Sequence, residues 1–138
     1  MSTTDPIVIV SASRTPMGGF MGGLSAVTSP DLGATAIRGA LAAANIANDQ
    51  VDEVIMGCVL PAGLKQAPAR QAALAADLSL STVCTTINKV CGSGMKAAMQ
   101  AHDSLMAGSI DVAVAGGMES MTNAPHPVSY THLRAHET

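Results

Sequence analysis

The sequence predicts an α/β fold built on a mostly parallel sheet with helices on both faces. Three observations support this prediction. Short runs of β-branched residues alternate with longer segments of helical periodicity along the chain. Hydrophobic residues make up 48% of the 138 residues, which is enough for one domain with a real core. With one Phe, one Tyr and no Trp, that core consists of small aliphatic side chains, which suit closely packed layers of helix and sheet.

The first elements are predicted from a β-branched run and a helix-start signal. Ile7 to Val10 predicts a strand that is buried on both faces. The Gly- and Met-rich segment 13–28 is typical of an irregular crossover. Ser29 then provides an N-cap and Pro30 a first helical position, so a helix is predicted that runs to about Ala44.

The remaining elements continue the alternation. The sequence predicts strands over 51–60, 82–87 and 110–115 and helices over 68–77 and about 91–107. The order strand-helix-strand favours parallel pairing through right-handed crossovers. The last helix carries an apolar stripe at helical spacing, formed by Met95, Ala98, Met99, His102 and Leu105. We therefore interpret His102 as a packing residue.

Composition excludes several classes of function. The net charge is −3 and no run of Lys or Arg occurs, so nucleic-acid binding is not expected. No stretch approaches the roughly 20 apolar residues of a membrane span. The start lacks the pattern of a secretory signal, and the three cysteines lack CxxC spacing. These features predict reduced thiols in a cytoplasmic protein.

The sequence changes character near residue 125. We predict that residues 1–125 belong to one partial domain and that residues 126–138 form a polar tail that does not match it. The tail holds His126, His132 and His136, and the last two could share a metal ion if the tail were helical. Two ligands on a tail rarely make a site, so no metal site is predicted.

The candidate nucleophile is Cys91, within the segment Asn88 to Met95. A thiol at a helix N-terminus lies among unpaired N–H groups, which favour the thiolate, and the N–H of Cys91 itself could bind an oxyanion. Gly92 and Gly94 would let a ligand approach the backbone. From these residues alone, a nucleophile and a buried core thiol both remain open interpretations of Cys91. Cys58 and Cys84, inside predicted strands, are interpreted as core residues.

A resemblance to a known family favours the nucleophile. Asn88 to Met95 resembles the nucleophile motif of the thiolases. Further blocks resemble that family in its own order, and together they cover roughly residues 6 to 126: Ser11 to Pro16 followed by Gly18 to Phe20, Gly57 to Gly63, Gln66 to Gln71, and Ala115 to Met121. A lone CGSG would be a weak signal, whereas ordered blocks are a strong one.

The resemblance implies a thiolase-like fold and an acyl transfer through Cys91. In thiolases this cysteine takes the acyl group of an acyl-CoA. The expected activity is that of an acetyl-CoA C-acetyltransferase, which condenses two acetyl-CoA into acetoacetyl-CoA. The alternatives are a degradative 3-ketoacyl-CoA thiolase and a non-catalytic thiolase-like fragment. The expected partners are acyl-CoA and CoA, with no bound cofactor, and the intact enzyme is expected to be a homodimer or homotetramer.

The chain also departs from the family pattern. The family's activating His, in a Gly-His motif, and its second catalytic Cys, in a Cys-x-Gly motif, do not occur after Cys91. The loop domain that holds most of the CoA is missing as well. We therefore expect only part of the N-terminal half of a thiolase, inactive or slowly self-acylating alone. A small thiol hydrolase or redox protein would need a His beside Cys91, and no motif indicates one.

Overall fold

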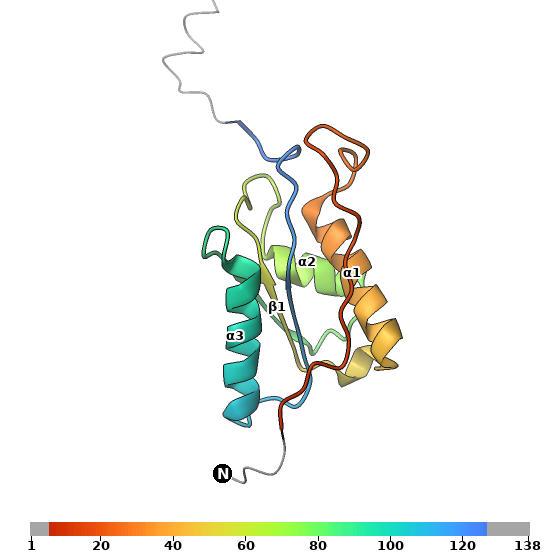
Figure 1. Cartoon of the computed structure of the whole chain (residues 1–138), viewed down its shortest axis with the longest axis vertical. Helices are drawn as coiled ribbons and strands as arrows, with labels where there is room; N and C mark the ends of the chain where they lie inside the picture. The colour runs from red at the N-terminus through yellow and green to blue at the C-terminus, as the bar shows by residue number, and fades with distance from the viewer. Residues whose placement is uncertain (1–5, 127–138) are drawn as a thin grey trace, which may run out of the picture.

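A three-stranded parallel sheet lies at the centre of the protein, with helices on both of its faces (Figure 1). The structure is a computed structural model that describes residues 6–126. The strand order is β2-β1-β3, which confirms the predicted α/β class. The elements are α1 (Ser29–Ala44), a 3-10 turn η1 (Asn48–Gln50), β1 (Glu53–Gly57), α2 (Pro68–Ala75), β2 (Val83–Ile87), α3 (Ser93–Met106) and β3 (Ala113–Gly117).

Helix α1 shows how local sequence sets the element ends. The Thr28 hydroxyl accepts a hydrogen bond from the Asp31 N–H at 3.3 Å, which satisfies one of the free donors of the first turn. The N-cap is therefore Thr28, one residue before the predicted Ser29. At the other end Asn45 adopts a left-handed conformation with φ 54°, and its N–H bonds back to the last turn.

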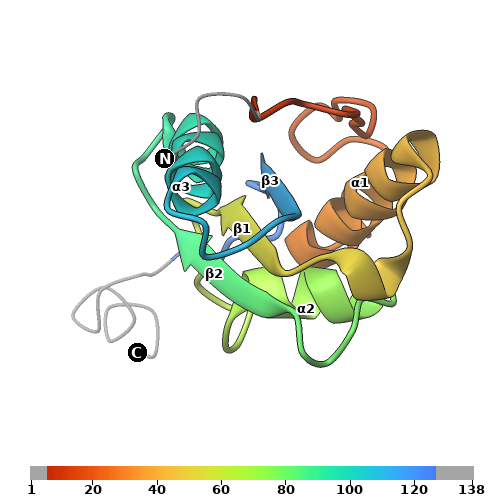
Figure 2. The same ribbon diagram turned by 90° about the horizontal axis from the view of Figure 1, so that it is seen from below.

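The two faces of β1 pack against different helices, as Figure 2 shows in the view from below. Val54 and Met56 face α1 and α2 and belong to the main buried cluster, together with Ile37 and Leu41 of α1. Ile55 points to the opposite face and packs with Ala97 and Ala101 of α3. This alternation follows from the two-residue period of a strand. It explains why the buried part of β1 after Glu53 is continuously apolar.

The predicted first strand is the main error of the sequence-based fold. Residues 7–10 belong to no strand and pair with none among the described residues, and Ile9 is 91% exposed. A cavity of about 590 Å³ separates this segment and α1 from α3 and β3. The Ser11 hydroxyl donates to the Ala40 carbonyl at 2.7 Å, which fastens the segment to α1 rather than to the sheet. The β-branched run therefore stays exposed, because no strand or helix among residues 6–126 fills the cavity beside it.

The outer edge of β3 borders the same cavity. The Met118 N–H donates to the Gly57 carbonyl, and the Val112 carbonyl accepts from β1. Backbone groups on a strand alternate in direction, so those of Ala113 and Ala115 point to the other edge. Within residues 6–126 that edge has no partner strand.

The apolar stripe predicted on the last helix is also not the buried face. Met95 is 74% and Met99 53% exposed, and the side chain of His102 is 58% exposed beside Asp103. The interpretation of His102 as a packing residue is therefore wrong. The α3 residues in the buried cluster on this face are small, Ala97 and Ala101, and His102 and Leu105 instead line the cavity.

Other element boundaries shift for identifiable reasons. The Asp52 carboxylate accepts hydrogen bonds from the N–H groups of Asp111 and Val112, which fixes a turn there and delays β3 until Ala113. The proposed division at residue 125 remains a prediction. His132 and His136 lie outside the described residues. No helix within 6–126 is long and apolar enough to span a membrane.

Candidate active site

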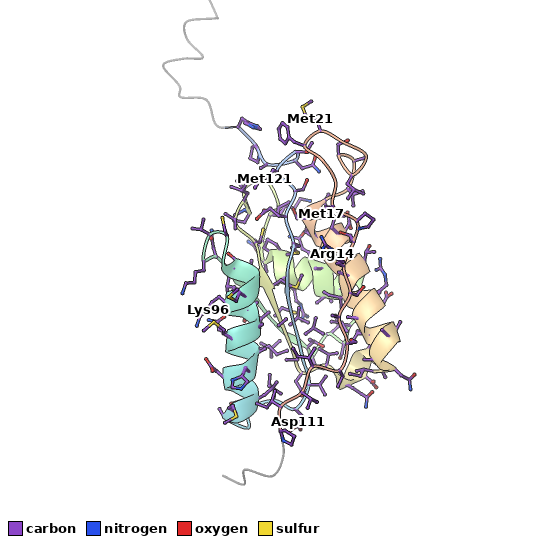
Figure 3. The ribbon with its side chains drawn as sticks, viewed as in Figure 1. Arg14, Met17, Met21, Lys96, Asp111 and Met121 are labelled. Atoms are coloured by element: carbon purple, nitrogen blue, oxygen red, sulfur yellow. The ribbon has the colours of Figure 1, made fainter. Side chains whose placement is uncertain are left out.

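The carboxyl ends of the three parallel strands meet at one edge of the sheet, where α/β proteins commonly place their sites. The loops that follow β1, β2 and β3 lie together there. Figure 3 shows Met17, Met21 and Met121 at this end of the molecule, whereas Asp111 lies at the opposite end. Cys91 follows β2 and therefore belongs to the same edge.

The structure places Cys91 in the loop between β2 and α3, with its side chain exposed. The helix begins at Ser93 rather than at Cys91, and the Lys96 N–H donates to the Gly92 carbonyl at 2.9 Å in its first turn. Cys91 therefore lies two residues before the first helical residue, Ser93, whose N–H donates to the Val90 carbonyl at 3.1 Å. The exposure of the Cys91 side chain is inconsistent with its interpretation as a core residue.

Two polar side chains hold the Cys91 loop. Ser93 is buried, and its hydroxyl accepts from the Lys89 N–H at 2.8 Å while donating to the Val90 carbonyl at 2.6 Å. The Asn88 side chain accepts from the Val90 N–H at 2.9 Å and donates to the Val59 carbonyl at 3.1 Å. The loop is thus bonded both to the helix after it and to the loop that follows β1.

The residue before Cys91 has an uncommon backbone conformation. Val90 has φ 48°, in the left-handed region. A β-branched side chain rarely adopts this conformation, because its Cβ branches crowd the backbone. Such strain costs on the order of 1–3 kcal/mol and is often found at functional sites. Here the hydrogen bonds of Asn88 and Ser93 hold the strained residue and turn the following Cys91 outward.

Gly57 allows α3 to begin close to the sheet. A Cβ on Gly57 would lie 2.6 Å from the Ser93 carbonyl carbon and 2.8 Å from the Gly94 nitrogen. These are backbone atoms, so the helix start would have to move. Gly94 faces less crowded space, because a Cβ added there would lie 3.8 Å from its nearest neighbour, the Gly116 carbonyl oxygen. The end of β1 and the start of α3 are therefore fixed relative to each other by one glycine.

The other two thiols occupy different environments. Cys58 is 1% exposed and lies in the main buried cluster, which confirms its interpretation as a core residue. Burial, and then the neighbouring Glu119 carboxylate, raise the pKa of the Cys58 thiol to about 11. It is therefore a neutral thiol near pH 7. Cys84 is partly buried against the same cluster, and its thiol donates to the Thr82 carbonyl at 3.5 Å.

The candidate nucleophile has no base bonded to it in the described chain. Within residues 6–126 no hydrogen bond or ion pair engages the Cys91 thiol, and no group of three His, Cys, Asp or Glu residues is placed to hold a metal ion. Ser93 and Glu119, which hold the surrounding loops, were not singled out from the sequence. The signal for Gly57 was present, since an isolated Gly in a strand often marks a close backbone approach.

Comparison with known proteins identifies relatives along almost the whole chain. The family model described as "Thiolase, N-terminal domain" matches residues 7–137. Human mitochondrial acetyl-CoA acetyltransferase is 57% identical over 124 residues, which are 90% of this chain and 29% of the human protein. The mouse mitochondrial protein of the same name is 55% identical over 127 residues, which are 92% of this chain and 30% of the mouse protein.

A solved structure agrees with this assignment. The Acat5 thiolase from Ascaris suum, crystallised in complex with coenzyme A, superposes with a TM-score of 0.86 and 39% identity. The match covers 88% of this chain and 32% of the Ascaris chain. The present chain therefore spans about 30% of the length of the relatives that it matches.

The comparison contradicts the predicted cytoplasmic location. The human, mouse and bovine relatives are all named as mitochondrial rather than cytoplasmic. The prediction relied on unpaired cysteines, and three free thiols do not distinguish one reducing compartment from another.

The family match covers nearly all of the residues, and the solved thiolase has the same arrangement of sheet and helices. The ordered sequence blocks around Cys91 lie within that match. The chain therefore belongs to the thiolase family, through its N-terminal domain.

Proposed function

We propose that this chain is part of an acetyl-CoA C-acetyltransferase and that Cys91 is its acyl acceptor. The observation that carries the proposal is the exposed thiol of Cys91 on a strained loop, ahead of α3 and at the carboxyl edge of a parallel sheet. Relatives at 54–57% identity are named acetyl-CoA acetyltransferases. The proposed substrates are coenzyme A thioesters, and the Ascaris thiolase structure contains coenzyme A.

The proposed first half-reaction is an acyl transfer to sulfur. The Cys91 thiolate attacks the thioester carbonyl carbon of acetyl-CoA, and a new carbon–sulfur bond forms as the bond to CoA breaks. CoA leaves as its thiolate and takes a proton from solvent, while the proton of Cys91 is lost to a base. In the full condensation a second acetyl-CoA, deprotonated at its methyl carbon, would attack the acyl carbon; as the new carbon–carbon bond forms, the bond to Cys91 sulfur breaks, which releases acetoacetyl-CoA and returns Cys91 as its thiolate.

The isolated chain is expected to perform this first step slowly at best. The described residues supply no hydrogen-bonded base for Cys91, and the members of a catalytic group act as a unit. The intact enzyme would draw its remaining groups from further polypeptide. We also propose that the intact enzyme is a homodimer or homotetramer, which sedimentation of the full-length protein would test. A monomer would contradict this part of the proposal.

Intact-mass measurement after incubation with acetyl-CoA at neutral pH tests the acyl acceptor. We expect a single acetyl adduct that forms slowly on the wild-type chain and is absent from Cys91→Ala. Cys84→Ala is the matched control, since it removes a partly buried thiol and should leave the adduct unchanged. An adduct that persists in Cys91→Ala, or that disappears only in Cys84→Ala, would refute the role of Cys91.

A further inference from the structure

The Glu119 carboxylate, just after β3, reaches across the sheet edge to the loop that follows β1. Its Oε2 accepts from the Val59 N–H at 2.7 Å and its Oε1 accepts from the Leu60 N–H at 3.1 Å. The Cys58 thiol also donates to Oε1, at 3.7 Å. Donors from three consecutive residues therefore converge on one carboxylate, in an arrangement typical of a backbone anion-binding turn.

The same loop is bonded to the segment that carries Cys91. The Val59 carbonyl accepts from the Asn88 side-chain nitrogen at 3.1 Å. The Asn88 side-chain oxygen in turn accepts from the Val90 N–H at 2.9 Å. Val59 thus bonds to Glu119 through its N–H and to Asn88 through its carbonyl. A continuous path of hydrogen bonds runs from the end of β3 to the residue before Cys91.

This path ends at the strained residue of the loop. Val90 has φ 48°, and a β-branched residue keeps such a conformation only when its surroundings enforce it. Asn88 is exposed, so neighbouring side chains do not hold its amide in place, and its orientation depends on the hydrogen bond to Val59. A displaced Val59 would therefore release the Asn88 amide, and Val90 would lose the partner of its N–H, keeping only the Ser93 bonds to its carbonyl to hold the left-handed conformation. The direction of the Cys91 side chain would change with it.

We propose that Glu119 is a positioning residue for Cys91 and that it acts through Val59 and Asn88. The inference rests on the proposed function in that it assumes Cys91 is the reacting thiol. It assigns no contact between Glu119 and substrate. The carboxylate holds the loop after β1 in place, and that loop fixes the amide that holds Val90 in its left-handed conformation.

Amide hydrogen exchange on the full chain tests the path directly. Glu119→Gln replaces an acceptor oxygen with an NH₂ group that faces backbone donors. We expect amide exchange to be about tenfold faster at Val59 and Leu60, which bond directly to Glu119. We also expect it to be severalfold faster at Val90, which is linked to Glu119 only through Val59 and Asn88. Glu53→Gln is the matched control, because that carboxyl lies at the other end of β1 and should leave all three amides unchanged.

A double-mutant cycle separates positioning from local support. Asn88→Ala should accelerate Val90 exchange and leave Leu60 unchanged, and adding Glu119→Gln should then change Val90 by less than about twofold. Glu119→Asp keeps the charge and should restore Val90 protection in part. If Glu119→Gln accelerates Val59 and Leu60 but leaves Val90 unchanged, the carboxylate merely supports the loop after β1, and the proposal is wrong.

A chemical readout links the path to the thiol. The rate at which iodoacetamide alkylates Cys91 should change severalfold in Glu119→Gln and in Asn88→Ala, while melting temperatures show that both variants stay folded. Equal alkylation rates in all variants would overturn the proposal, and Glu119→Asp, whose shorter side chain alters the same bonds, replaces Glu119→Gln in this test if the latter does not fold. Acetyl-CoA takes no part in these measurements. A missing acetyl adduct would therefore refute the proposed function without altering this result.

Discussion

The two faces of the sheet differ sharply in how completely they are packed. On the α1 and α2 face, Val54, Met56, Ile37 and Leu41 are at most 5% exposed. On the α3 face the buried cluster contains only Ile55, Ala97 and Ala101, and the larger residues of α3 border a cavity or solvent. The described chain therefore draws most of its stability from one face, while the other positions the helix that follows Cys91.

The largest test of this difference compares two leucines. Leu41→Ala removes a 5% exposed side chain from the main cluster and should lower the free energy of unfolding by about 2–5 kcal/mol. Leu105→Ala, on the cavity side of α3, should lower it by less than about 1 kcal/mol, because this side chain is only half-buried. Urea denaturation of the two variants measures the difference. Equal losses would show that the α3 face is as well packed as the other.

A pair of glycines tests the contact between β1 and α3. Gly57→Ala forces a Cβ against the Ser93 and Gly94 backbone and should cost about 1–3 kcal/mol. It should also alter the rate of Cys91 alkylation, because α3 must move. Gly94→Ala, inside α3 where an added Cβ would make only ordinary van der Waals contacts, should instead stabilise by about 0.5–1 kcal/mol. A neutral Gly57→Ala would mean that this contact does not fix the helix start.

The smallest expected effect is a pH dependence of the packed face. The pKa of the Cys58 thiol is about 11 in the folded chain against an ordinary value of 9.0. Because the folded-state pKa is raised, the contribution of the neutral Cys58 thiol to the free energy of unfolding is fully present below pH 9. This contribution is lost as pH rises towards 11. The loss is at most about 1.4 kcal/mol per pH unit. Denaturation curves at about pH 8 to 11 should show it, and Cys58→Ala should flatten this part of the profile. A wild-type profile that is already flat would contradict the assigned burial.

The sequence predicts elements well where local signals suffice. Each of the first two helices has a proline in its first two positions, Pro30 in α1 and Pro68 in α2. Both predicted helix starts lie within one or two residues of the observed ones. The setting of Cys91 between a strand and a helix was likewise predictable, because it depends only on neighbouring residues. Its chemistry came from the family resemblance rather than from these signals.

Long-range contacts explain what the sequence did not predict. A β-branched run such as 7–10 becomes a buried strand only if another strand lies beside it, and the run itself does not contain that information. The stripe on α3 showed which residues are apolar but not what they face. Glu119 bonds to residues about 60 positions earlier in the chain, so no local pattern marks it.

The open edges of the sheet have a practical consequence for handling the protein. The outer edges of β2 and β3 have no partner strand in the described region, and their sequences, VCTTI and AVAGG, contain no charged residue or proline. Natural sheets usually guard such edges with lysine, proline or a bulge. We therefore expect the chain to self-associate through edge-to-edge pairing as its concentration rises. Purification at low concentration should then recover more monomer than purification followed by concentration.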